Sequence, residues 1–143
     1  MYDDILLPTD GSSAMATALE HAVAIATDQD ARIHVIYVVD KRLYTAASED
    51  STDEIRQSLE EEAEIALDDA RVHIEDEGIE CLTHSEEGIP YTTITDYADE
   101  QEVDLVVMGT HGETGRERMV NLGSTTERVL KNASMPVLVV DLE

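Results

Sequence analysis

Basic residues are scarce in this chain of 143 residues, which has nine Lys and Arg against 33 Asp and Glu and a formal net charge of −24. Binding to nucleic acid and docking on an anionic membrane both need a basic surface, so the composition argues against both partners. No apolar run approaches the length of about 18 residues that a membrane-spanning helix needs. The N-terminal segment MYDDILLPTDG lacks the basic and long apolar regions of a signal peptide. We therefore expect a soluble, cytoplasmic protein.

Cysteine and large aromatic residues are also nearly missing. Cys81 is the single cysteine, so an intramolecular disulfide and a CxxC site are both excluded. Phe and Trp are absent, but 42% of the residues are hydrophobic, mostly Val, Ile, Leu and Ala in regular patterns. Such patterning is typical of a folded protein and not of an acidic disordered tail. The length predicts one domain, residues 1–143.

The acidic residues are spread over most of the chain, which suggests a property of the whole surface. At low salt this charge repels itself and destabilises the compact state. At molar salt the Debye length falls to about 3 Å and the repulsion is largely screened. The composition therefore favours a protein from a salt-loaded cell, such as that of a halophile.

Apolar runs and helical spacing alternate along the chain. The apolar runs predict strands at 4–9, 32–39, 79–85, 105–109 and 136–141. Helical patterns occupy 14–26, 52–78, 88–101 and 124–132, the last with Val129 and Leu130 inward, while 40–52 reads as a surface loop. This alternation predicts an α/β fold, a Rossmann-like three-layer sandwich with a parallel sheet between helices. With the strand order 3-2-1-4-5, ligands would bind between the first and fourth strands.

A glycine-punctuated stretch follows the fourth predicted strand, LVVMGTHGETGRERMVNLGSTT at 105–126. Gly109, Gly112 and Gly123 allow the backbone to turn tightly and to approach a ligand closely. Ser124 and Thr125 begin a predicted helix, whose unpaired N–H groups and positive dipole end suit a phosphate. The stretch fits neither the P-loop pattern nor GxGxxG. By itself it fits a phosphate cradle and an ordinary strand-to-helix turn equally well.

Four motifs together resemble the universal stress protein family over essentially the whole chain: ILLPTDGS, VIYVVD, VVMGTHG and GSTTERVLKNASMPVLVV. The resemblance implies a five-stranded fold in the order 3-2-1-4-5 and a homodimer. One branch of this family binds ATP through the pattern Gly-x2-Gly-x9-Gly-Ser/Thr. This chain resembles that branch, but ten residues, 113–122, separate Gly112 from Gly123, one more than in the pattern.

The resemblance also implies roles for individual residues. Thr9 and Asp10 would face the ribose or the adenine, and Val38 would meet the adenine through its backbone. The phosphates would lie against main-chain groups of the glycine loop and against the helix mouth. Mg²⁺ could bridge the phosphates, although the sequence shows no dedicated carboxylate cage and predicts no metal ligand. The predicted cofactor-binding residues are Pro8, Thr9, Asp10, Val38, Met108, Gly109, His111, Gly112, Gly123, Ser124 and Thr125.

The favoured function is an ATP-binding regulatory module of the stress response, whose nucleotide-bound state is recognised by a partner protein. The sequence does not identify this partner. One alternative is a slow ATPase or self-phosphorylating enzyme that uses Ser124, but no base or lysine is placed to make it fast. Others are a ligand-free dimeric interaction protein and a nucleotide binder of the electron-transfer flavoprotein type. The last predicted strand, which begins with Pro136 and ends with Asp141, is apolar and at a sheet edge, so it predicts a homodimer.

Overall fold

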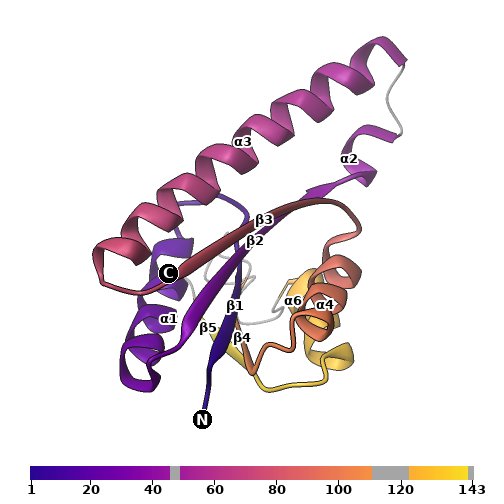
Figure 1. The fold of residues 1–143 in the computed structure, drawn as a ribbon. Coiled ribbons are helices and arrows are strands. Elements are labelled where there is room, and N and C mark those ends of the chain that lie inside the picture. Colours follow the sequence, from indigo (N-terminus) through magenta and orange to yellow (C-terminus); the bar gives the residue numbers. More distant parts are fainter. Residues whose placement is uncertain (46–48, 111–122, 142–143) are drawn as a thin grey trace.

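Five parallel strands form one sheet in the order β3-β2-β1-β4-β5, with helices on both faces (Figure 1). The structure is a computed structural model that describes residues 1–45, 49–110 and 123–141. The predicted fold and strand order are therefore confirmed. The strands are β1 (Asp4–Pro8), β2 (Arg32–Asp40), β3 (Cys81–Gly88), β4 (Leu105–Gly109) and β5 (Val137–Val140).

Within the described part of the chain, helices cover both faces of the sheet (Figure 1). On one face lie α1 (Met15–Gln29) and α3 (Glu49–Asp76), and on the other lie α4 (Pro90–Glu100) and α6 (Ser124–Asn132). A one-turn helix, α2 (Arg42–Thr45), follows β2 and packs against α3. The first strand shows why its run is uniformly apolar. Ile5 and Leu7 belong to the core under α1 and α3, and Leu6 belongs to the core under α4 and α6.

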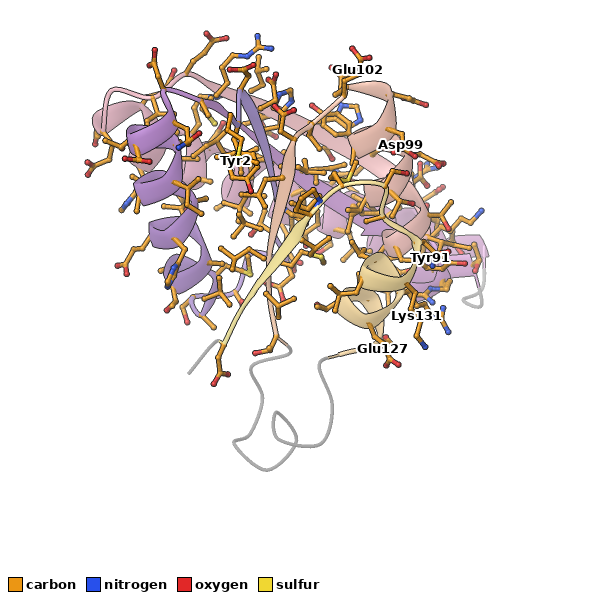
Figure 2. All side chains as sticks on the ribbon, turned by 90° about the horizontal axis from the view of Figure 1, so that it is seen from below. Tyr2, Tyr91, Asp99, Glu102, Glu127 and Lys131 are labelled. Atoms are coloured by element: carbon orange, nitrogen blue, oxygen red, sulfur yellow. The ribbon has the colours of Figure 1, made fainter. Side chains whose placement is uncertain are left out.

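The pair α4 and α6 is joined at its surface as well as in its core. Figure 2 shows Tyr91 of α4 beside α6, and the Arg128 guanidinium of α6 lies 5.3 Å from the centre of the Tyr91 ring. On α6, the Lys131 ammonium and the Glu127 carboxylate form an ion pair at 3.2 Å (Figure 2). The contact between Arg128 and Tyr91 holds α6 against α4, while the ion pair stabilises α6 itself.

Two details of the sequence interpretation were wrong. The region predicted as a surface loop contains α2 and the start of α3, and the Tyr44 side chain on α2 is buried in the core with only 5% exposure. The residues around Tyr44 are mostly polar, and a single turn is too short to show a helical period. The sequence pattern therefore did not predict that Tyr44 is buried. On α6 the inward positions are Thr126 and Val129, three residues apart, whereas the Leu130 side chain is 40% exposed.

No helix within the described part of the chain is long and apolar enough to cross a membrane.

Candidate functional site

A cavity of about 600 Å³ opens at the carboxyl ends of the strands, where β1 and β4 lie side by side and their connections leave in opposite directions. This is the switch point of the sheet, the position at which open α/β sheets bind ligands. Nine of the eleven predicted residues line the cavity, and the other two, His111 and Gly112, lie outside the described residues. The nine are Pro8, Thr9, Asp10, Val38, Met108, Gly109, Gly123, Ser124 and Thr125.

The turn after β1 is fixed by hydrogen bonds at each step. The Thr9 N–H donates to the carbonyl oxygen of Ile36 at 2.9 Å, the Gly11 N–H to the Thr9 hydroxyl oxygen at 3.1 Å, and the Ser12 N–H to Asp10 Oδ1 at 2.9 Å. Gly11 has a φ of +80°, which only glycine adopts at little cost. This turn therefore places the exposed Asp10 carboxylate at the cavity in a defined position.

Tyr37 forms part of the same wall and is buried. Burial raises the pKa of its phenol, and the negative charges of Glu62 and Asp10 raise it further. A phenol of raised pKa stays protonated through the neutral range. Tyr37 therefore contributes a neutral hydroxyl and an aromatic surface, and no charge, to the cavity.

The second strand extends past the end of the first and exposes its backbone to the cavity. The last residue of β1, Pro8, pairs with Ile36, while β2 continues to Asp40. Alternate residues of a parallel strand direct their N–H and C=O groups to the same side. Since the Ile36 carbonyl faces β1, the N–H and C=O of Val38 face the same side, beyond the end of β1. A backbone donor and acceptor thus stand together at the cavity wall.

The first turn of α6 also lines the cavity. Gly123, at the N-cap, has a φ of +91°, and Ser124 and Thr125 begin the helix. The first N–H groups of a helix have no acceptor within it, and the helix dipole adds a partial positive charge at this end. In a chain of net charge −24, this nine-residue helix offers an anion a favourable binding point.

Part of the cavity wall was missed from the sequence. Leu43 on α2, Leu59 on α3, and Pro90 and Ile94 on α4 all line it. Pro90 and Ile94 belong to a helix that the sequence predicts, but helical spacing alone does not show which end of a helix lies at a ligand site. The only signal for Leu43 was an apolar residue within a stretch that has no clear period.

An ion pair sets the start of α2. The Arg42 guanidinium donates to both oxygens of the Asp40 carboxylate, at 2.9 Å from Nε and 2.8 Å from a terminal nitrogen. The Arg42 backbone N–H also donates to Asp40 Oδ1 at 3.0 Å. These hydrogen bonds hold the pKa of the Asp40 carboxyl below its ordinary value. Asp40 lines the cavity, but both of its carboxylate oxygens accept hydrogen bonds from Arg42. Its main role here is to fix the backbone at the start of α2.

The described residues contain no group of three or more His, Cys, Asp or Glu side chains that could hold a metal ion. Apart from the carboxylates of Asp10 and Asp40, this cavity is lined by backbone groups, hydroxyl side chains and apolar residues. Such a lining suits an organic ligand that carries an anionic group.

The comparisons with known proteins agree with one another. A sequence model of the universal stress protein family matches residues 1–141. Universal stress protein MJ0531 of Methanocaldococcus jannaschii is 43% identical over 141 residues, which are 98% of this chain and 82% of that protein. The solved structure of MJ0577 from the same organism has a TM-score of 0.87 at 34% identity and covers 100% of this chain and 98% of its own. A universal stress protein from Archaeoglobus fulgidus, solved in complex with dAMP, shares the fold with a TM-score of 0.70 at 23% identity, over 96% of this chain and 97% of its own.

Proposed function

The chain belongs to the universal stress protein family, and on this premise we propose that it is a regulatory module that binds an adenine nucleotide, with ATP as the ligand. One observation carries the proposal. Val38 on β2 and the first turn of α6, which is hydrogen-bonded to the end of β4, line the same cavity of about 600 Å³ from either side of β1. The first suits a base, the second suits phosphate, and the exposed carboxylate of Asp10 lies in the wall with them.

The base end matches adenine in its hydrogen-bonding pattern. Adenine presents an acceptor at N1 next to a donor at N6, and the Val38 N–H and C=O are a donor and an acceptor on one residue. The side chains of Val38 and Met108 add apolar surface to the cavity. The dAMP complex of the Archaeoglobus fulgidus protein supports the choice, because dAMP carries the same base on the same fold.

The remaining residues of the cavity wall suit the ribose and the phosphates. Asp10 accepts hydrogen bonds from ribose hydroxyls, with Pro8 and Thr9 beside it. Ser124 and Thr125 offer backbone N–H groups and hydroxyls to phosphate oxygens. We assign the main-chain groups of Gly109, His111 and Gly112 to the same role by the family resemblance. A bound Mg²⁺ would be held mainly by the phosphates, which is the usual arrangement for this ion with nucleotides.

A homodimer through β5 belongs to the proposal. β5 is the outermost strand, and its first three residues, Val137, Leu138 and Val139, are only partly buried. An apolar edge strand that stays exposed invites aggregation. Pairing with a second copy around a two-fold axis, from Pro136 to Asp141, would remove that edge. Light scattering in molar KCl tests this assignment, and a monomer at micromolar concentration would contradict it.

The experiment for the nucleotide starts with protein purified in molar KCl. Acid release and chromatography identify any bound nucleotide, and titration calorimetry of the stripped protein with ATP and Mg²⁺ measures affinity. We expect Gly123→Val to abolish binding, because a branched side chain enters the cavity and strains the backbone at a φ of +91°. Gly78→Val is the matched control. Gly78 has a φ of +79°, and an added Cβ there meets no atom within 4 Å.

The two variants separate loss of fold from loss of binding. Both should lower the temperature of unfolding by a similar amount, but Gly78→Val should keep the affinity for ATP. A wild-type protein that carries no nucleotide and ignores millimolar ATP would overturn the proposal.

A further inference from the structure

The one-turn helix α2 presents an apolar side chain to the cavity from the solvent side. Leu43 is 60% exposed and yet lines the cavity, together with the half-buried Leu59 of α3. Single exposed leucines are common and need no explanation by themselves. Leu43 differs because it lies at the mouth of the cavity that we assign to a nucleotide.

The backbone that carries Leu43 is well anchored. The Lys41 N–H donates to the carbonyl oxygen of Gly88 at 3.2 Å, which ties the start of α2 to the end of β3. Tyr44, the next residue after Leu43, is buried in the core, and its carbonyl oxygen accepts from the Thr52 hydroxyl at 3.1 Å. With the ion pair between Asp40 and Arg42, α2 is fixed at both ends. The exposure of Leu43 is therefore a result of a defined backbone position.

The two helix layers provide one apolar wall each. A planar base that hydrogen-bonds to the Val38 backbone lies roughly in the plane of the sheet, as an additional strand would. Its two faces then meet the two layers of helices. On the side of α4 the cavity is lined by Ile94 and Met108, which belong to the hydrophobic core under α4 and α6. On the side of α3 it offers Leu43 and Leu59.

We propose that Leu43 on α2, backed by Leu59, covers the α3-side face of the bound base and so sets the affinity of the site for the base and not for the phosphates. This inference rests on the proposed nucleotide function and adds to it an element that lies outside the glycine loop. The base is sandwiched between the Leu43 and Leu59 wall and the Ile94 and Met108 wall. Binding removes the exposed part of Leu43 from water, which is the source of the affinity.

The test compares Leu43→Ala with the wild type by titration calorimetry in molar KCl, with adenosine, AMP and ATP as three separate probes. Removing the contact of one leucine side chain should lower the affinity about fivefold to tenfold. The factor should be the same for all three probes, because Leu43 touches only the part they share. Ile65→Ala is the matched control, since Ile65 on α3 is 63% exposed and does not line the cavity.

Each outcome separates this inference from the function on which it rests. If the wild type binds none of the three probes, the nucleotide proposal fails. If the wild type binds and Leu43→Ala binds equally well, only the role of Leu43 is wrong. A loss confined to ATP would overturn it too, because it would place Leu43 against the phosphates. Chemical unfolding of both variants should match the wild type within experimental error, as expected for side chains that are mostly exposed.

Discussion

The Thr126 hydroxyl donates a hydrogen bond to the carbonyl oxygen of Gly109 at 2.9 Å, although the two residues are 17 positions apart in the sequence. This contact joins the end of β4 to the first turn of α6. The sequence has one residue more than the family pattern between Gly112 and Gly123. The strand end and the helix mouth are therefore in direct contact in a chain that has the longer connection.

Thr126→Val should test how strongly this contact holds the site. Thr126 is 5% exposed, and the change keeps its shape but removes the hydrogen bond. We expect a loss of about 1–2 kcal/mol in the free energy of unfolding, measured with urea in high salt. Affinity for ATP should fall more than affinity for adenosine, because the helix mouth faces the phosphates in our proposal. Thr126→Ser restores the hydroxyl and should recover both the stability and the affinity. If Thr126→Ser behaved like Thr126→Val, the role given to this hydrogen bond would be wrong.

Tyr97→Phe should expose the cost of an unpaired group in the core. His34 is 2% exposed and has both ring nitrogens in contact, Nδ1 with the Tyr97 hydroxyl and Nε2 with Asp4 Oδ1, each at 2.8 Å. Removing the hydroxyl leaves Nδ1 without this partner, and we expect a loss of about 1–3 kcal/mol in the free energy of unfolding. Tyr91→Phe is the control on the same helix, because its contact with Arg128 uses only the ring. An equal effect of both changes would argue against a special role for His34.

Cys81 should react slowly with thiol reagents in the native protein. Burial raises the pKa of the thiol from 9.0 to about 11, with Glu75 adding to the rise and Arg71 opposing it. At pH 8 the thiolate is the reactive form, and its fraction should be about 100-fold lower in the native than in the unfolded state. Labelling with iodoacetamide with and without denaturant measures this ratio, and Cys81→Ser is the blank. A native rate equal to the unfolded rate would contradict the shift.

The same thiol makes stability depend on pH in the alkaline range. Its folded-state pKa lies above its unfolded value, so its contribution is fully present below pH 9. As the pH rises from 9 towards about 11, the unfolded state ionises first and stability is lost. Cys81→Ser should reduce the loss of unfolding free energy between pH 9 and about 11. Other groups that titrate in this range are present in both proteins and contribute equally to both curves.

Salt should raise the stability of the folded state. With a net charge of −24 the surface repels itself, and ions screen this repulsion. We expect the temperature of unfolding in 2 M KCl to exceed that in about 50 mM KCl by more than 10 °C, with most of the gain below about 1 M because the Debye length is then already near 3 Å. Calorimetry over a KCl series measures it. A protein that is fully stable near zero salt would remove the support for a halophilic origin.

The local sequence determined the elements because their signals are short-range. The strand Leu105–Gly109 and the helix Ser124–Asn132 were predicted with the bounds that the structure gives. A continuous apolar run specifies a strand buried on both faces, and a cap-type residue before a helical period specifies a helix start. The strand order followed from alternation of strands and helices together with the family resemblance.

The tertiary structure alone decided which distant residues share a surface. No spacing in the sequence brings Leu43 to the cavity, because α2 is a single turn whose place depends on the buried side chain of Tyr44 and on the Asp40 carboxylate. Likewise, the exposed backbone of Val38 exists only because β2 is longer than β1 at this end. Sequence patterns report which side chains are apolar or polar. The relative lengths of neighbouring strands and the anchoring of a short turn depend on packing between segments far apart in the chain, and packing is what fixes this site.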